Sequence, residues 1–325
     1  MTDTLLAEGA PPPAIVRSAV ATPRPRRRRN GRHLLAPYLF IAPAAALFLV
    51  FFIAPIVYAI QLSFFGQRVA GASGGFGRRE QVFVGFENYV ASITDPEFLA
   101  SLGRLALYAI IVIPCTLSIA LLFALLLDLP RVRAARLWRT GILLPYAVPG
   151  VIAAMMWGFL YLPSTSPVNA ILAVFGLPAL DPLDGASIFG ALANIAIWGG
   201  VGFNMVIMFT ALRSVPSEVY EAARIDGCGE RAIALRIKVP LIMPSLVLTG
   251  LFALIGTLQA YSEPTMLRPL TDTITSTFFP LMKVHTDAFT NDNINLAAAT
   301  AVVICAFTLV ASALLLRATR EKEER

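Results

Sequence analysis

Residues 101–127 read SLGRLALYAIIVIPCTLSIALLFALLL, and this stretch decides the fold class. It holds one charged side chain, Arg104, close to its beginning. A continuous apolar run of this length is long enough to cross a bilayer as a helix, which needs about 20 residues. A helix also satisfies its own backbone hydrogen bonds in lipid. The stretch is therefore predicted to be a transmembrane helix.

Five further stretches have the same character, so the sequence predicts an all-α integral membrane protein with six transmembrane helices. The composition agrees, because 57% of the residues are hydrophobic and only 14% are charged, whereas soluble domains carry about a quarter charged residues. The first stretch is too long for the apolar core of a signal peptide. The predicted spans are residues 34–62, 101–127, 141–162, 188–212, 241–262 and 295–316.

The chain divides into one membrane domain with a polar tail at each end. Residues 1–33 are rich in proline and arginine and are expected to be disordered, residues 34–317 form the transmembrane domain, and residues 318–325 form a charged tail. Twenty of the 26 Lys and Arg residues fall in the two tails and in alternate loops. Positive charge favours the cytoplasmic side, so both termini are predicted to be cytoplasmic in a multi-pass protein.

The longest of these inner loops, residues 213–240, is predicted to form two short helices joined by a turn. Ser214 or Ser217 is placed to cap the first helix. Asp226–Gly227 is expected to end it, because glycine adopts positive φ easily. The second helix is predicted to cover residues 228–238 and to stop at Pro240, since proline removes a backbone donor. The first helix carries small residues, which allow a partner surface to approach closely.

The spacing of residues in this loop resembles a known motif. A Glu-Ala-Ala triplet is followed after three residues by Gly, and after nine more by Ile-x-x-Pro. This pattern is similar to that of the permease subunits of bacterial binding-protein-dependent ABC importers, although Val239 stands where leucine is usual. The resemblance covers roughly residues 34–317 and is strongest to the maltose-permease-like sugar branch. It implies that the loop is a cytoplasmic coupling helix between helices four and five, formed by Glu221, Ala222, Ala223, Asp226 and Gly227.

The resemblance also implies a function and a set of partners. The chain would be the permease of an importer in the bacterial cytoplasmic (inner) membrane that moves a sugar, an oligosaccharide in the first instance, by ATP-driven alternating access. It would not be an enzyme: no G-x-x-x-x-G-K-[ST] motif is present, so ATP and Mg would bind to a partner ATPase. The implied partners are two ATP-binding subunits, a second permease in a heterodimer, an extracytoplasmic solute-binding protein and lipid, without nucleic acid.

The substrate-lining residues are implied by the register of the motif within the fourth and fifth spans. Among the register positions only Gln259 forms hydrogen bonds through its side chain, so either the pocket is weak in this subunit or the partner permease supplies more polar groups. Trp198, Tyr261 and Glu263 are polar residues nearby. Each of them either lines the substrate pocket or only packs against its neighbours. The residues assigned to the lining are Gly199, Gly200, Phe203, Asn204, Gly256 and Gln259.

Other functions stay open at this point. A permease for a polyol or a glycerol phosphate has the same motif. An ion-coupled secondary carrier needs buried ionisable groups and often has inverted repeats, which the sequence does not show. A membrane-embedded enzyme would need an acid or metal site, and three loop acids (Asp181, Asp184 and Asp272) leave that possibility open. No metal site is predicted, because His33 and His285 are isolated and the three cysteines are far apart.

Overall fold

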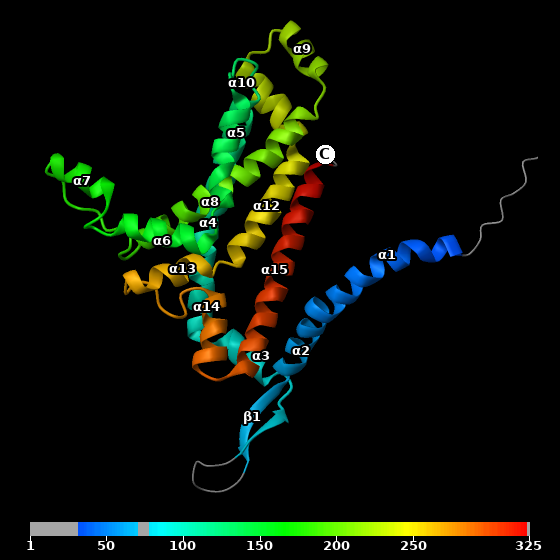
Figure 1. Ribbon diagram of the computed structural model, residues 1–325, viewed down its shortest axis with the longest axis vertical. Coiled ribbons are helices and arrows are strands. Elements are labelled where there is room, and N and C mark those ends of the chain that lie inside the picture. Colours follow the sequence, from blue (N-terminus) through cyan, green and yellow to red (C-terminus); the bar gives the residue numbers. More distant parts are fainter. Residues whose placement is uncertain (1–31, 71–77, 324–325) are drawn as a thin grey trace, which may run out of the picture. The chain divides into compact units, whose positions relative to one another are not determined.

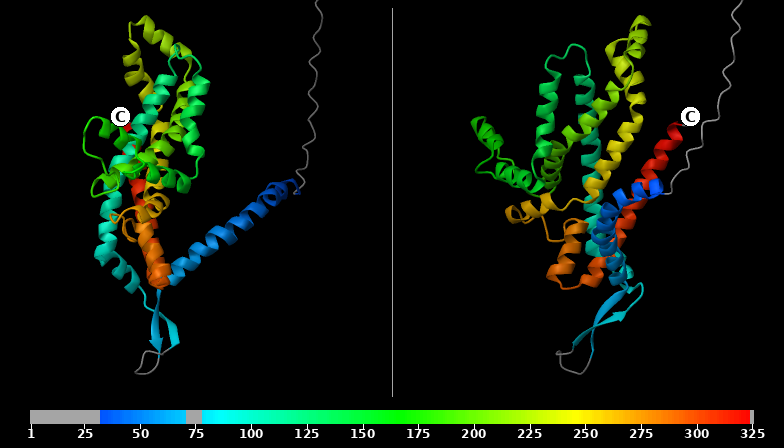
Figure 2. Two further views of the ribbon diagram at one scale, coloured as in Figure 1. Left: turned by 60° about the vertical axis from the view of Figure 1, so that its left-hand side comes forward. Right: turned by 45° about the vertical axis from the view of Figure 1, so that its right-hand side comes forward.

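The computed structural model describes residues 32–70 and 78–323. The tail predicted over residues 1–33 lies outside the described residues except for its last two positions, so its expected disorder is not addressed. The backbone contacts divide the chain into two units, one ending at Ala54 and the other running from Pro55 onward. The site and its chemistry lie in the second unit, shown from α2 onward in Figure 1 and Figure 2.

The described chain is helical apart from one hairpin, which confirms the predicted fold class. In chain order the elements are α1 (Arg32–Phe48), η1 (Leu49–Ile53), α2 (Ala54–Ser63), β1 (Phe65–Ala70), β2 (Arg78–Phe83), α3 (Glu87–Thr94), α4 (Pro96–Leu127), α5 (Ala135–Leu143), η2 (Leu144–Ala147), α6 (Gly150–Tyr161), α7 (Pro167–Val174), α8 (Ser187–Arg213), α9 (Ser217–Ile225), α10 (Glu230–Ile233), η3 (Ala234–Lys238), α11 (Val239–Leu241), α12 (Met243–Leu258), α13 (Ser262–Leu267), η4 (Arg268–Leu270), α14 (Pro280–His285), η5 (Thr286–Thr290) and α15 (Ile294–Glu323).

Five helical segments are long and apolar enough to cross a membrane, and a sixth span exists if a bent pair of helices counts as one. The span predicted over residues 141–162 corresponds to this bent pair, in which the chain turns by 94° between Ala135–Ala147 and Gly150–Tyr161. Pro149 accounts for the break. The residue before a proline is pushed into an extended conformation, and Val148 has φ −80° and ψ 124°.

The core of the second unit forms where α4 packs along α8, with α12 against both. One side chain has to be absent for this packing. A Cβ at Gly202 of α8 would lie 2.3 Å from the carbonyl oxygen of Ile142 and 2.7 Å from the Cα of Leu143. Only glycine therefore lets α8 approach the α5–η2 backbone this closely. Buried Met205 and Met208 continue the packing on α8.

A two-stranded hairpin, β1–β2, was not anticipated from the sequence. Its strands are antiparallel with Phe65 opposite Phe83 and Arg68 opposite Glu80. The hairpin lies with α3 and α14 at one end of the second unit, and α9 lies at the opposite end, as both views in Figure 2 and the view in Figure 1 show. Two distinct ends of the molecule are thus available to different partners.

Many large apolar side chains are exposed on the helices. Ile110 of α4, Val174 of α7 and Leu309 of α15 are examples in the second unit, and Phe40 of α1 is one in the first. A water-soluble protein rarely exposes so many contiguous apolar side chains. This distribution is the one expected of helices that contact lipid or another transmembrane chain.

Candidate functional site

The predicted turn after α9 is present. The helix ends at Asp226, and Gly227 follows with φ +82°. The Cys228 N–H donates to the carbonyl of Ala223 over 2.9 Å, and the Gly227 N–H donates to Arg224 over 3.0 Å. These two hydrogen bonds form the Schellman arrangement that satisfies the last carbonyls of a helix and favours glycine at the left-handed position. The glycine in the motif is therefore required by the backbone.

Two local predictions for this loop were wrong. No serine side chain caps α9, because Pro216 occupies the N-cap position and the Ser214 hydroxyl donates back to Ala211 in the last turn of α8. The second helix does not stop at Pro240. It runs from α10 through η3 into α11, where Pro240 lies in the first turn.

The residues assigned to coupling present a small, mostly exposed surface. The side chains of Glu221, Ala222 and Asp226 are exposed, as is Gly227, whereas Ala223 is buried against the rest of the chain. The helix therefore has one inner face that fixes it and an outer face that is open to a partner. The exposed face combines a carboxylate with small residues, as the motif predicts.

A group of charged side chains anchors this loop; we call Asp128, Arg213, Tyr220 and Lys238 the loop cluster. Lys238 Nζ lies 2.5 Å from Asp128 Oδ2, and only 5% of each side chain is exposed. Arg213 Nη1 lies 4.0 Å from Asp128 Oδ1, and Lys238 Nζ lies 4.9 Å from the centre of the Tyr220 ring. The cluster joins the ends of α4 and α8 to α9 and to the segment after it. Burial raises the pKa of Tyr220, and the charge of Asp128 raises it further.

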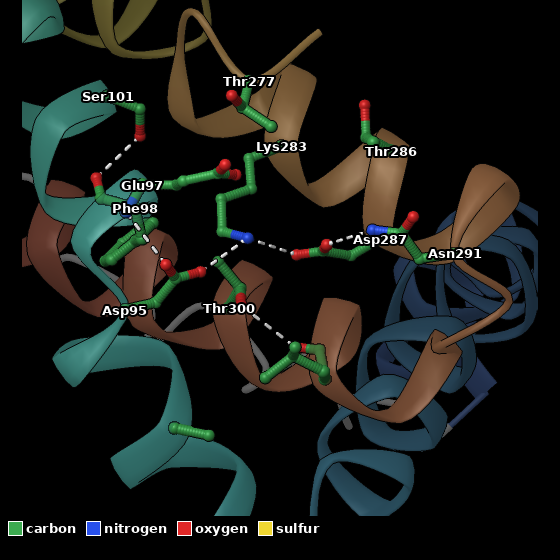
Figure 3. A network of polar contacts seen from close by, with 12 residues as sticks. Asp95, Glu97, Phe98, Ser101, Thr277, Lys283, Thr286, Asp287, Asn291 and Thr300 are labelled. Carbon is green, nitrogen blue, oxygen red and sulfur yellow. Dashed lines mark hydrogen bonds and ion pairs between the residues drawn. The ribbon is translucent and has the colours of Figure 1, made fainter.

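A second group of charges lies at the opposite end; we call Asp95, Lys283 and Asp287 the Lys283 cluster (Figure 3). Lys283 Nζ lies 2.6 Å from Asp95 Oδ2 and 3.0 Å from Asp287 Oδ2. Asp95 also caps α4 by accepting the Glu97 N–H, and Asp287 accepts the Asn291 side-chain N–H over 3.0 Å. The cluster ties the beginning of α4 to α14 and η5. Sequence reasoning missed it, since Lys283 had no recognisable motif.

The ionised forms of this cluster stabilise one another. Burial acts to raise the pKa of Asp95, but the hydrogen bonds from Lys283 and from the Glu97 N–H outweigh it, so the pKa lies below its ordinary value of 3.8. Burial likewise acts to lower the pKa of Lys283, yet the two carboxylates hold it above its ordinary 10.5. Asp95 and Lys283 are therefore both charged over the neutral pH range.

Between the two ends lies a pocket of about 660 Å³, bounded by α4, η2, α6, α8, α12 and the beginning of α13. Trp198, Phe252, Thr257, Tyr261 and Glu263 are on its wall. The structure places around this one pocket all of the residues assigned to the lining, namely Gly199, Gly200, Phe203, Asn204, Gly256 and Gln259.

Part of the pocket wall comes from helices that the sequence did not implicate. Tyr146 of η2 stacks on Phe203 with ring centres 4.8 Å apart and an angle of 15° between the planes. Phe203 also faces Phe252 at 6.2 Å. Thr116 of α4 lies on the same wall. Tyr146 was missed because the register covered only the fourth and fifth spans; its position between Pro145 and Pro149, at a break in an apolar run, was the available signal.

Two polar atoms on the wall have no partner within the described residues. They are Asn204 Oδ1 and Thr116 Oγ1. The Asn204 side-chain N–H donates over 2.8 Å to the carbonyl of Gly200, one turn earlier in the same helix. This hydrogen bond of Asn204 lies within α8 and does not connect it to another helix. Buried polar atoms without partners are uncommon in folded proteins and call for an explanation.

Comparison with known families identifies the chain. The family described as "Binding-protein-dependent transport system inner membrane component" matches residues 120–320. The chain belongs to this family. It is thus a permease subunit of an ABC importer, as the loop motif indicated. The match covers the loop cluster and most of the pocket.

Several characterised permeases are similar to this one along nearly their whole length. A diacetylchitobiose uptake system permease protein, NgcF, from Streptomyces coelicolor is 30% identical over 91% of this chain and 86% of the relative. An sn-glycerol-3-phosphate transport system permease protein, UgpA, from Salmonella choleraesuis is 30% identical over 88% of this chain and 94% of its own. A sulfoquinovosyl glycerol transport system permease protein, SmoG, from Agrobacterium fabrum is 29% identical over 90% of this chain and 92% of the relative.

Solved structures confirm the fold. A bacterial alginate ABC transporter in complex with an alginate pentasaccharide-bound periplasmic protein contains a chain that superposes with a TM-score of 0.76. The two chains are 20% identical, and the match covers 91% of this permease and 98% of the other chain. The two chains therefore share one overall fold.

Proposed function

We propose that this permease imports a saccharide and that α9 is the helix through which an ATP-binding subunit drives it. The observation that carries this proposal is the loop cluster. An exposed docking helix transmits movement only if it is firmly attached to the spans, and the buried Lys238–Asp128 ion pair attaches it to α4. Since α4 also lines the pocket, displacement of α9 has a direct route to the translocation path.

The working cycle follows from this attachment. Two ATP-binding subunits bind ATP and Mg and close, and Glu221, Ala222, Ala223, Asp226 and Gly227 form the surface that follows them. The spans then switch the pocket between the two sides of the membrane, which couples two distant sites energetically. A second permease completes the pocket, most simply as a heterodimer. A solute-binding protein delivers the substrate, as the family description implies.

The orientation proposed for the permease is that both termini and α9 face the cytoplasm. Support comes from the charges, because 20 of the 26 Lys and Arg residues fall on that side. The β1–β2 hairpin, α3 and α14 lie at the other end of the second unit (Figure 1), so they face the solute-binding protein. The two ends then meet chemically different partners.

The substrate class is supported by the relatives and by the pocket. The similar permeases are named for diacetylchitobiose, sn-glycerol-3-phosphate and sulfoquinovosyl glycerol. Aromatic side chains such as Tyr146 and Phe203 line the pocket here, and sugar pockets combine apolar faces with a few placed polar groups. An oligosaccharide fits a volume of about 660 Å³. A polyol or a glycerol phosphate is the second candidate.

The test is to isolate the permease with its native partners and to measure uptake in proteoliposomes. We expect an ATPase to co-purify and uptake to require ATP. Glu221→Lys should abolish uptake while the complex still assembles, because it reverses the charge on the docking face. Glu221→Asp, which keeps the carboxylate, serves as the control. Uptake without ATP, or full uptake by Glu221→Lys, would contradict the proposal and favour an ion-coupled carrier.

A further inference from the structure

The pocket has an unusual charge pattern for a protein whose relatives handle anionic solutes. Among its lining residues in the described part of the chain, Glu263 is the one carboxylate, and no lysine, arginine or histidine is present. Glu263 makes no ion pair or hydrogen bond with the described residues. A Cβ added at Gly150 would lie 3.3 Å from Glu263 Oε1, so the carboxylate is held beside the beginning of α6.

Two acceptor groups of the pocket require hydrogen-bond donors from a ligand. An ionised carboxylate only accepts hydrogen bonds, and so does an amide oxygen. Glu263 is an acceptor of this kind, and so is Asn204 Oδ1, which has no partner within the described residues. The Asn204 side chain is 5% exposed, so its oxygen has little access to bulk water. A ligand has to bring O–H or N–H groups to satisfy them.

The aromatic wall adds a second requirement. Tyr146, Phe203 and Phe252 follow one another with ring centres 4.8 Å and 6.2 Å apart. Such rings pack against the C–H face of a sugar ring, while its hydroxyl groups point to the edges. Among the described lining residues there is no cation to pair with a phosphate, which binds most strongly to charged donors.

We infer that this pocket takes an uncharged saccharide, whose hydroxyl or amide groups donate to Glu263 and Asn204, and that it rejects phosphorylated, sulfonated and carboxylated solutes. Phosphate and sulfonate oxygens in their ionised forms donate no hydrogen bond, and they are repelled by the unpaired carboxylate. Glu263 is thereby assigned as the residue that selects by charge. The inference rests on the proposed function, because it assumes that the pocket lies on the substrate path.

The experiment uses the intact transporter in lipid nanodiscs without the solute-binding protein, so that only the membrane pocket selects. The probes are N,N′-diacetylchitobiose and sn-glycerol-3-phosphate, with binding measured calorimetrically. We expect the neutral disaccharide to bind at least about tenfold more tightly. Glu263→Gln should weaken it about tenfold, because hydrogen bonds to a charged acceptor are the stronger kind. Glu263→Lys should invert the preference.

Controls separate selection from folding. Glu80→Gln removes an exposed carboxylate on β2, far from the pocket, and should leave both affinities unchanged. Thermal unfolding of Glu263→Gln should match the unaltered protein. If glycerol phosphate binds as tightly as the disaccharide, or if Glu263→Gln changes neither affinity, the inference is overturned.

ATP-driven uptake by the same transporter is measured in parallel. This measurement distinguishes a failure of the inference about the pocket from a failure of the proposed importer function. Saccharide uptake that persists without any saccharide binding in the nanodiscs would overturn the assignment of selection to this pocket and leave the importer function standing. If the unaltered transporter neither binds the saccharide nor takes it up with ATP, both the inference about the pocket and the proposed importer function are overturned.

Discussion

The two charge clusters at opposite ends of the second unit differ in the number of short ion pairs that hold them together. In the Lys283 cluster one cation is shared by two carboxylates at 2.6 and 3.0 Å, and further N–H donors reach both acids. In the loop cluster one carboxylate faces two cations, of which only Lys238 is close. Arg213 stands at 4.0 Å with 68% of its side chain exposed.

This difference in ion pairing suggests that the two clusters have different structural roles. The Lys283 cluster is closed on itself and fixes the beginning of α4 against α14. The loop cluster holds α4 through one short ion pair, while the second cation, Arg213, is mostly exposed and lies over the Phe209 ring at 5.7 Å. If α9 docks on an ATP-binding subunit as proposed, such a loosely held second cation would let the attachment adjust between states, and the opposite end would serve as the fixed point.

The largest effect is expected from Lys283→Met. The substitution leaves two carboxylates close together and partly buried with no cation between them, so the free energy of unfolding should fall by about 3–5 kcal/mol. Thermal unfolding of the purified protein in detergent measures this. Lys283→Arg should retain most of the stability. A melting temperature for Lys283→Met equal to that of the unaltered protein would show that the Lys283 cluster does not stabilise the fold.

A smaller loss of stability, about 2–3 kcal/mol, is expected from Lys238→Met, because Arg213 still neutralises Asp128 in part. Its larger consequence should be functional: ATP hydrolysis by the assembled transporter continues while uptake per ATP falls. The double variant Asp128→Leu with Lys238→Met removes both charges and should recover stability but not uptake. Recovery of both would mean that the ion pair has only a structural role.

Arg213→Ala should be nearly silent for stability, with a loss below about 1 kcal/mol, since the pair is long and largely exposed. Measured beside Lys238→Met, it tests whether the two cations of the loop cluster are truly unequal. A loss as large as that of Lys238→Met would contradict the adjustable attachment described above.

The pH response of the Lys283 cluster should be flat near neutrality. The contribution of Asp95 is present above its ordinary pKa of 3.8 and is lost as the pH falls through its lowered value. That of Lys283 is present below 10.5 and is lost as the pH rises through its raised value. The difference in melting temperature between the protein and a variant in which the whole cluster is uncharged (Asp95→Asn, Asp287→Asn and Lys283→Met together) should therefore stay constant from about pH 5 to about pH 9. A decline within that range would contradict the assignment.

The sequence predicted the features that depend on local patterns. Apolar runs located the spans, and the glycine at position 227 located the turn after α9, because positive φ is a property of one residue and its neighbours. The motif spacing also led to the lining residues on α8 and α12. The spans and the turn need only local patterns in the chain, whereas the lining residues were implied by the resemblance to the sugar-permease branch.

What the sequence did not predict depends on contacts between distant residues. Asp128 and Lys238 are 110 positions apart, and each alone was an ordinary charge at the end of a helix. The prolines at positions 145 and 149 indicate a bend in the apolar run, but they do not give its angle of 94°. Thr116 and Tyr146 reach the pocket only through that bend and the packing of α4 on α8.

The most direct test of the assignment of the two ends is site-specific photo-cross-linking in the native membrane, with the photoreactive residue either at position 222 on α9 or at position 81 on β2. Both side chains are exposed. We predict that position 222 captures an ATP-binding subunit and that position 81 captures the solute-binding protein. Capture of the ATP-binding subunit from position 81, or its absence from position 222, would contradict the account.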